Sequence, residues 1–355
     1  MLYYNGTERP RDIELIRASI REITDRKIKS GKFTDIPDRK PGKNLFTIQT
    51  ANKWIADERL KPNPKMLFGG FWLEHELCIL FADTNMGKSI LAVQLGNSIS
   101  RADPIEPFAI HAEPCPVLYL DFELSAKQFE LRYTDHKGIY SFGEGFYRAE
   151  FNAAADMPYQ FKNFEDYVNN AIEYALEQTG AKVLIIDNIT CLRGGTERAA
   201  DALPLMKHLK ALKDRLHLSI LVLAHTPKRN PASPLTRNDL QGSKMLINFA
   251  DSAFAIGESH TLPGYRYLKQ IKQRSGNETY GQHNVCLCRL ERRDSFLQYT
   301  FTGYAHEHDH LRRPSQQRRD HLSAQISTLK VQGKTQRQIA AELKIGLGTV
   351  NRLGR

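Results

Sequence analysis

Gly87, Lys88 and Ser89 form a run of three residues whose types suit the binding of phosphate. They end the segment L-F-A-D-T-N-M-G-K-S, which lies between an apolar run at 77–81 and a helix-like stretch at 90–95. In a loop that joins a strand to a helix, the backbone N–H groups and the positive end of the helix dipole surround phosphate oxygens. A lysine there reaches the β- and γ-phosphates, and a serine hydroxyl binds Mg²⁺. The segment therefore predicts a nucleotide site that takes ATP with Mg²⁺.

The residues that we expect to surround the nucleotide belong to this loop and the start of its helix: Ala82, Asp83, Thr84, Asn85, Met86, Gly87, Lys88 and Ser89. Ala82 stands where the pattern G-x-x-x-x-G-K-S has its first glycine. A small residue can often follow the same turn, so this departure weakens the motif without removing it.

Two carboxylates follow other apolar runs and can act on a bound triphosphate. Asp187 ends the run that starts at Val183, a pattern typical of a carboxylate that holds Mg²⁺ directly or through water. Glu123 comes shortly after the run 117–121, and we expect it to position or deprotonate the attacking water as a general base. Asp121 is the rival carboxylate. The alternative for Glu123 is a glutamate that only stabilises a helix N-terminus.

His225 ends a fourth apolar run, 219–224, and we expect it to sense the γ-phosphate. The alternative is a strand-end histidine with satisfied hydrogen bonds. The four runs alternate with helical patterns, which predicts an α/β domain with a mostly parallel, doubly wound sheet. Ligands of such a sheet bind at the carboxyl ends of its strands, where Lys88, Glu123, Asp187 and His225 would meet.

The composition favours a polyanionic partner, because the 355 residues carry a formal net charge of +10. Residues 304–355 hold ten Lys and Arg against four Asp and Glu, which is more than half of this excess. No apolar run is long enough to cross a membrane, and the N-terminus lacks the pattern of a signal peptide, so we expect a cytoplasmic location. The five cysteines form no C-x-x-C pair, which makes metal and disulfide interpretations weak.

Residues 1–65 have the pattern of an N-terminal helical arm followed by a linker. Five apolar residues fall near helical spacing with charges between them: Ile13, Leu15, Ile16, Ile20 and Ile23. An amphipathic helix needs a partner surface, which is either its own domain or a neighbouring subunit. A second, short helix is expected over 51–60, with Trp54 turned inward.

Three further stretches carry a resemblance to a known family. F-E-L-S-A-K-Q-F-E-L-R at 122–132 resembles the glutamate motif of the DnaB-type and plasmid RepA-type hexameric helicases, which are RecA-like ATPases. The stretch 239–251 resembles their motif in which a Gly-Ser pair precedes an apolar helix and an Ala-Asp pair. L-K-Q-I-K-Q-R-S-G at 268–276 resembles the late strand whose K-x-R reaches across to the ATP of a neighbouring subunit.

The resemblance implies a RecA-like P-loop ATPase domain over 66–303 that associates with itself, as a homo-hexamer. It also implies that Glu123 activates water, and that Lys272 and Arg274 act in trans on the neighbour's ATP. Such a cation arrives from outside and stabilises the charge that develops on the transferred phosphoryl group.

A basic loop, 226–240, follows His225 and is rich in Pro, Asn, Arg and Lys. We expect it to project toward the central channel of a ring, where Lys228, Arg229 and Arg237 contact phosphates of single-stranded DNA. An ordinary solvated loop is the alternative.

Residues 304–320 have the composition of a basic linker, and 321–355 have the spacing of a small all-α helix-turn-helix domain. That spacing turns one set of apolar residues inward: Leu322, Ile326, Leu329, Ile339, Ala340, Leu343, Val350 and Leu353. The domain resembles the resolvase-invertase type, in which Thr349, Asn351 and Arg352 would face the major groove of duplex DNA. A helical hairpin used for assembly is the alternative.

Two functions are consistent with these observations. The first is an ATP-hydrolysing DNA motor of the hexameric helicase class, in replication or transfer of a plasmid, phage or mobile element. The alternative is an ATP-dependent DNA-binding regulator or assembly factor without unwinding activity. A small-molecule kinase is disfavoured, because it leaves the basic tail and the K-x-R strand unexplained.

Overall fold

The computed structural model describes residues 46–152, 154–189, 199–227, 229–240, 244–312 and 316–354. The amphipathic helix predicted near the N-terminus lies outside these ranges. The chain divides into two compact units, Met1–Asn63 and Pro64–Arg355. Within the described ranges, none of the helices combines the length and the apolar character that crossing a membrane would require.

Helix α2 (Ala51–Arg59) forms where the sequence predicts a short helix in the first unit. It begins after Thr50, whose side-chain oxygen accepts a hydrogen bond from the backbone N–H of Lys53 and so caps the helix. The prediction that Trp54 turns inward is wrong. Its side chain is 42% exposed, because α2 buries none of its residues.

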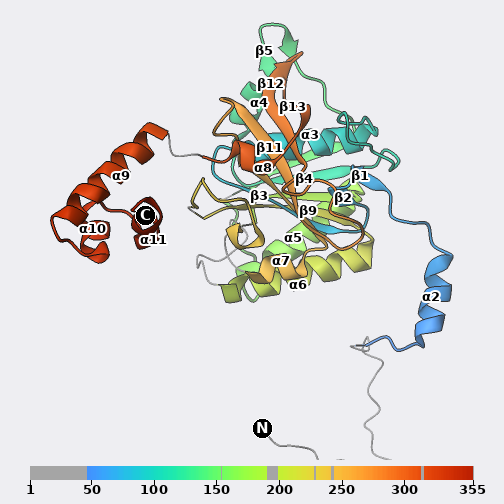
Figure 1. The fold of residues 1–355 in the computed structure, drawn as a ribbon. Helices are drawn as coiled ribbons and strands as arrows, with labels where there is room; N and C mark the ends of the chain where they lie inside the picture. The colour runs from blue at the N-terminus through green and yellow to red at the C-terminus, as the bar shows by residue number, and fades with distance from the viewer. Residues whose placement is uncertain are drawn as a thin grey trace, which may run out of the picture. The chain divides into compact units, whose positions relative to one another are not determined.

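A nine-stranded sheet forms the centre of the second unit (Figure 1), in the order β13, β12, β11, β10, β3, β9, β8, β4, β7. Six neighbouring strands are parallel: β10 (Ser252–Glu258), β3 (Leu77–Ala82), β9 (Ser219–His225), β8 (Val183–Asp187), β4 (Val117–Asp121) and β7 (Phe146–Glu150). Three antiparallel strands complete the sheet: β11 (Tyr265–Gln273), β12 (Val285–Arg293) and β13 (Phe296–Ala305). The predicted α/β fold class with a mostly parallel sheet is confirmed.

Helices cover both faces of this sheet, as expected for strands that are apolar throughout. Successive residues of a strand point to opposite faces. In β3, Leu77, Ile79 and Phe81 therefore pack with α5 (Phe164–Thr179) and α6 (Ala199–Leu216), while the alternate residues pack with α3 (Lys88–Arg101). Figure 1 shows α3 on one face and the pair α5 and α6 on the other. The core thus consists of two apolar layers that hold β3 rigidly between them.

The register of the parallel strands brings their carboxyl ends to one edge. Ala82 at the end of β3 lies opposite His225, and Asp121 lies opposite Asp187. Two backbone hydrogen bonds continue this alignment past the strand ends, from Phe122 N to Asp187 O at 2.8 Å and from Thr226 N to Ala82 O at 3.0 Å. The residues predicted to act on a nucleotide therefore follow strands that end side by side.

Smaller elements complete the second unit: β1 (Met66–Phe68), β2 (Trp72–Leu73), α4 (Ala126–Arg132), β5 (Thr134–Asp135), β6 (Gly138–Ile139), the 3₁₀ helix η2 (Arg237–Asp239), α7 (Lys244–Phe249) and α8 (Glu307–His310). In α8, Glu307 is 1% exposed and forms an ion pair with Lys269 on β11. Its carboxylate also accepts a hydrogen bond from Leu235 N at 2.7 Å. These contacts join the loop after β9 to the rest of the core, which continues past β13 into α8.

The C-terminal residues fold into α9 (Gln316–Val331), α10 (Gln336–Glu342) and α11 (Leu347–Leu353). One fully buried residue from each helix meets the others, namely Ile326, Ile339 and Val350. Helix α10 begins at a capping box, in which the Thr335 hydroxyl accepts from Gln338 N and the Gln338 side-chain oxygen accepts from Thr335 N. The buried residues are those that the apolar spacing turns inward.

Candidate active site

The phosphate-binding loop leaves β3 at Ala82 and enters α3 at Lys88. Gly87 has φ +87°, and a Cβ there would lie 2.8 Å from the Tyr299 hydroxyl oxygen, so both the backbone conformation and the close approach require glycine. The Tyr299 hydroxyl donates a hydrogen bond to the Met86 carbonyl and so holds the loop from β13. The first N–H groups of α3 have no partner within the helix and remain available to an anion.

Lys88 is 6% exposed at the start of α3. Its Nζ donates hydrogen bonds to the carbonyls of Ala82 and Asp83, both at 3.1 Å, and lies 3.2 Å from Nδ1 of His225. Burial lowers the pKa of Lys88, and the Asp187 carboxylate opposes that shift. The ammonium group thus bonds to the carbonyls of its own loop, and it would have to leave them to contact a phosphate.

Asp187 lies beside Ser89 at the end of β8 and is 1% exposed. Hydrogen bonds from the Ser89 and Tyr119 side chains stabilise its carboxylate, the latter at 2.6 Å. Burial nevertheless dominates and raises the Asp187 pKa to about 6. A carboxylate and a hydroxyl side by side provide the hard oxygen ligands that Mg²⁺ prefers, so these residues fit the predicted metal.

Glu123, Asn188 and His225 form one polar cluster next to Lys88. The Asn188 side-chain amide donates to Oε1 of Glu123 and lies 3.1 Å from Nε2 of His225. That Nε2 is also 3.4 Å from Oε1 of Glu123. The hydrogen bond from His225 is the largest cause that lowers the pKa of Glu123. Glu123 is therefore ionised at neutral pH, and its side chain keeps 37% of its surface exposed. A carboxylate in this state can accept a proton from water.

Asp121, the other candidate for the general base, is buried and its carboxylate oxygens already accept hydrogen bonds. Its side chain is 0% exposed and one oxygen accepts from the backbone N–H groups of Glu123 and Leu124, at 3.1 and 2.9 Å. The other oxygen accepts from Nε of Arg148 at 2.9 Å. A buried carboxylate with all these donors has no access to water, so the geometry favours Glu123 as the base.

A family described as an AAA domain matches residues 47–231. The chain belongs to the AAA domain family. The match spans the phosphate-binding loop, Glu123, Asp187 and His225. Among solved structures, the chain is similar to a KaiC-like protein from the hyperthermophilic archaeon Pyrococcus horikoshii, at 14% sequence identity and a TM-score of 0.44. The alignment covers 66% of this chain and 93% of that one. No curated protein sequence matches the chain.

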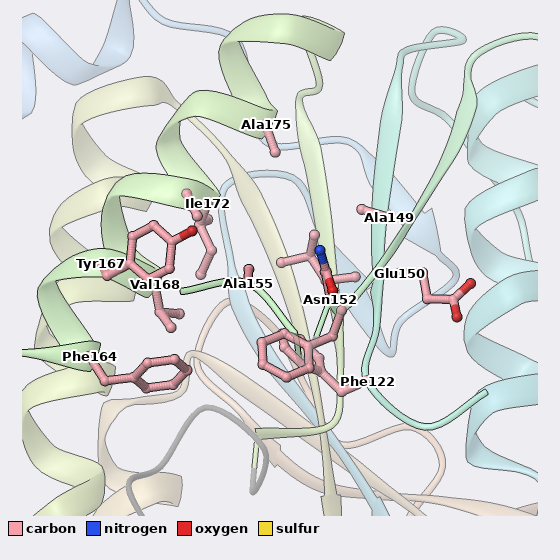
Figure 2. Close-up of a pocket in the computed structure, with 13 residues that line it drawn as sticks. Phe122, Ala149, Glu150, Asn152, Ala155, Phe164, Tyr167, Val168, Ile172 and Ala175 are labelled. Carbon is pink, nitrogen blue, oxygen red and sulfur yellow. The ribbon is translucent and has the colours of Figure 1, made fainter. Parts of the chain in front are cut away.

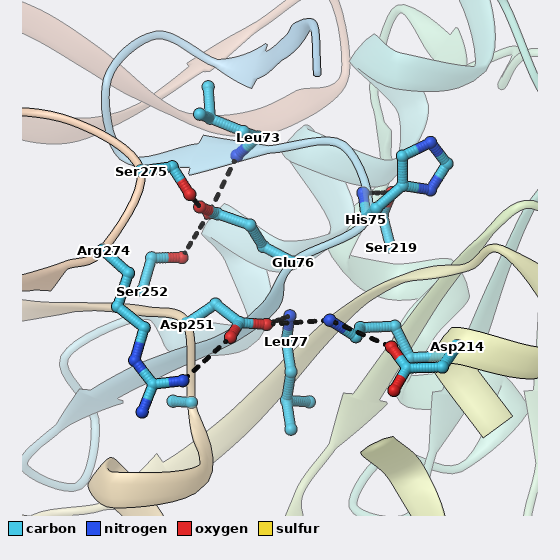
Figure 3. A network of polar contacts seen from close by, with 12 residues as sticks. Leu73, His75, Glu76, Leu77, Asp214, Ser219, Asp251, Ser252, Arg274 and Ser275 are labelled. Atoms are coloured by element: carbon cyan, nitrogen blue, oxygen red, sulfur yellow. Dashed lines mark hydrogen bonds and ion pairs between the residues drawn. The ribbon is translucent and has the colours of Figure 1, made fainter. Parts of the chain in front are cut away.

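The family and the sheet together confirm the coarser part of the resemblance, a RecA-like P-loop ATPase domain. Arg274 lies outside the matched residues, at the edge of the sheet opposite to the phosphate-binding loop of its own chain. Arg274 contacts Asp251, whose carboxylate accepts from Leu77 N at the start of β3. Figure 3 shows this network, in which Asp251 also pairs with Lys213. The full length of β3, roughly 20 Å at about 3.3 Å per residue, separates Arg274 from Lys88.

Lys272 lies on β11, two residues before Arg274, and its side chain caps the C-terminal end of α7. Its Nζ donates to the carbonyls of Ile247 and Ala250 at the end of α7, both at 2.6 Å. Burial lowers the Lys272 pKa to about 8. The finger roles of Lys272 and Arg274 stay predictions, and in this arrangement Arg274 is the more exposed side chain.

The residues predicted to contact single-stranded DNA differ in their surroundings. Lys228 lies outside the described residues. Arg229 turns toward the phosphate-binding loop, with Nε 4.0 Å from the Asp83 carboxylate, and its Nη1 donates to Ser233 O at 2.8 Å. Arg237 on η2 is exposed and donates from Nε to Ile271 O. Of the two described arginines, Arg237 has the accessibility that a phosphate contact needs.

The residues predicted to read duplex DNA lie on α11. Asn351 and Arg352 are exposed, and Thr349 is half-buried. Because Val350 between them fills the core of the three helices, α11 presents Asn351 and Arg352 away from that core. Asn351 and Arg352 thus have the exposure that the helix-turn-helix hypothesis requires, whereas Thr349 is half-buried, and DNA binding by all three stays a prediction.

An apolar pocket of 280 Å³ lies beside the turn that carries Glu123. Figure 2 shows Phe122 at this pocket together with Phe164 and Tyr167 of α5, while the Glu150 carboxylate points away. None of the predicted site residues lines it. The pocket therefore lies on the apolar side of the turn and does not include the polar cluster beside Lys88.

Sequence reasoning missed several residues of the site, of which Asn188, Tyr119 and Tyr299 are the clearest. Asn188 directly follows Asp187, so a polar residue after the strand end was a usable signal. Tyr119 and Tyr299 lie within strands, 68 and 213 residues from the groups that their hydroxyls contact. No local pattern reveals such pairs, because only the folded sheet brings them together.

Proposed function

We propose that the chain is an ATP-hydrolysing DNA motor of the hexameric helicase class, which acts in replication or transfer of a plasmid, phage or mobile element. The observation that carries the proposal is the contact between His225 and both Lys88 and Glu123. It joins the group that would hold the γ-phosphate to the group that would activate water.

The hydrolytic step follows from these positions. Lys88 would leave the loop carbonyls to contact phosphate oxygens, and His225 would then lose its contact with Lys88. Glu123, which is ionised, would accept a proton from a water placed for attack on the γ-phosphorus. Asp187 and Ser89 would hold Mg²⁺, which neutralises charge on the phosphates when bound.

The position of Arg274 supports self-association, on the hypothesis that its guanidinium acts on a phosphate. A guanidinium that lies the length of β3 away from its own loop acts on a phosphate only if that phosphate belongs to another copy. The Arg274 side chain is 48% exposed, so it is accessible to a neighbour. A ring of six copies is the arrangement that the resemblance implies.

DNA is the partner that the charge favours. Arg237 is exposed on the loop that leaves the active site through His225, so a strand held there would sense the nucleotide state. The three C-terminal helices would bind duplex DNA through Asn351 and Arg352 and so bring the motor to its substrate.

The second candidate is a regulator or assembly factor in which ATP sets the oligomeric state. The C-terminal helices α9–α11 support the regulator as much as the motor, because either function would use a duplex-binding domain. Strand displacement by the purified protein separates the two. ATP-dependent opening of a forked duplex supports the motor, whereas DNA-stimulated ATP hydrolysis without opening supports the regulator.

A further inference from the structure

We infer that Arg148, on the edge strand β7, is a positioning residue that holds the turn carrying Glu123 in the geometry needed for hydrolysis. The inference rests on the proposed function, because it assigns a role toward the general base of that function. Arg148 itself does not contact Lys88 or Glu123, and it acts through the Asp121 side chain and the Leu124 carbonyl of the turn.

The turn has little regular structure to fix it. It leaves β4 at Asp121 and enters α4 at Ala126, so Glu123 belongs neither to a strand ladder nor to a helix. Its N–H and that of Leu124 both bond to the Asp121 carboxylate, at 3.1 and 2.9 Å. The position of Glu123 therefore depends on the position of the Asp121 side chain.

Arg148 fixes that side chain and the far end of the turn at the same time. Its Nε donates to Oδ2 of Asp121 at 2.9 Å, and its Nη2 donates to the Leu124 carbonyl. The guanidinium also lies over the Phe129 ring on α4, 4.8 Å from the ring centroid. One planar group thus contacts the chain before Glu123, after it and on the helix that follows.

Burial makes this arrangement sensitive to a single substitution. The Arg148 side chain is 15% exposed and that of Asp121 is 0% exposed, so the buried Asp121 carboxylate depends on this guanidinium for charge compensation. Arg148 has a second ion pair, from Nη1 to the exposed Glu150 carboxylate at 3.1 Å. Removal of the guanidinium leaves a buried carboxylate with one oxygen unpaired, which is strongly unfavourable. A lysine would restore a charge but not the fork that reaches Asp121 and Leu124 together.

The test compares ATP turnover and nucleotide binding in the full-length protein. For Arg148→Ala we expect kcat to fall about 10- to 100-fold, because a misplacement of about 1 Å has an effect of that size. KM and the Kd for a fluorescent ATP analogue should stay within twofold, because the phosphate-binding loop is untouched. Arg148→Lys should show the same split, and added guanidinium or methylguanidinium should restore part of the turnover of Arg148→Ala.

Arg292→Ala is the matched control. Arg292 also donates to backbone carbonyls, those of Arg132, Thr134 and Ser295, but it does so away from the Glu123 turn. Its loss should leave kcat within twofold. Circular dichroism and thermal unfolding identify folded variants. If Arg148→Ala does not fold, Arg148→Lys carries the comparison, because it keeps the charge beside Asp121.

A double variant decides whether Arg148 acts through Glu123. We expect Glu123→Gln with Arg148→Ala to have the same residual turnover as Glu123→Gln alone. The inference is overturned if a folded Arg148 variant keeps the wild-type kcat or if KM and kcat change together. It is also overturned if the double variant loses turnover by the product of the factors measured for the two single variants. If the wild-type protein itself does not hydrolyse ATP, or if Glu123→Gln turns over normally, the proposed function fails instead.

Discussion

Nζ of Lys88 and Nδ1 of His225 lie 3.2 Å apart, which connects the phosphate-binding loop to the strand end next to Glu123. A lysine ammonium can only donate, so Nδ1 is the acceptor in this contact and a ring proton is on Nε2. That Nε2 faces the Glu123 carboxylate at 3.4 Å. A phosphate that draws Lys88 away would therefore free Nδ1 of His225, which gives this histidine a physical means to report nucleotide binding.

Lys88→Ala should weaken nucleotide binding by roughly 10- to 150-fold, the range that corresponds to loss of one hydrogen bond to a charged group. The remaining loop amides and the α3 dipole would still contribute. Titration with a fluorescent ATP analogue measures the effect. An affinity equal to that of the wild type would show that the lysine does not reach the phosphates.

Glu123→Gln should keep the affinity for ATP and lower turnover by about 100- to 10,000-fold, because general base catalysis contributes on that scale. The amide cannot accept the proton of water. Release of inorganic phosphate under saturating ATP is the measurement. Glu130→Gln on the neighbouring α4 is the control, since its only described ion pair is an exposed one with Lys127. Normal turnover in Glu123→Gln would show that Glu123 is not the general base.

Asp187→Asn should abolish Mg²⁺-dependent turnover and yet stabilise the nucleotide-free protein at high pH. Burial raises the Asp187 pKa to about 6 from an ordinary value of 3.8. The ionised carboxylate therefore destabilises the fold by at most about 3 kcal/mol above pH 6, and this penalty fades as the pH falls toward 4. Thermal unfolding at pH 8 should show a higher Tm for the variant, with a smaller difference at pH 5. A difference that grows at low pH would contradict the burial argument.

Arg352→Ala should weaken binding of duplex DNA by about 1–3 kcal/mol, or roughly 5- to 150-fold, without changing basal ATP turnover. Arg352→Lys keeps the charge and should retain most of the non-specific affinity while losing discrimination between sequences. Fluorescence anisotropy at fixed salt, with specific and random duplexes, compares the two. Unchanged binding in both variants would favour a role of α11 in assembly.

The sequence predicts the part of this protein that local patterns determine. Four continuous apolar runs become β3, β4, β8 and β9, because strands buried on both faces need such runs. The polar residues that end them then meet at one edge. The capping box at Thr335 and the inward set around Ile326 were predictable for the same reason, since each depends on spacing within a helix or a turn.

Contacts between distant segments could not be predicted in this way. Strand β7 has the sequence F-Y-R-A-E, which has no apolar alternation, and it became a strand only by pairing with β4. Its Arg148 then reached Asp121, 27 residues earlier. Strand β10 is rich in alanine, serine and glycine, and its central place beside β3 follows from tertiary packing.

The central claim is that ATP is hydrolysed between two copies of the chain, with Lys88 and Glu123 from one copy and Arg274 from the other. The most direct measurement is ATP turnover in mixtures of Lys88→Ala and Arg274→Ala proteins. At an ATP concentration near the wild-type KM, each variant alone should lose most of its turnover. Mixtures should regain activity with a maximum near equal amounts, because an interface between the two variants can then have all its groups intact. Wild-type turnover by Arg274→Ala alone, or mixed assemblies that stay inactive at every ratio, would contradict the account.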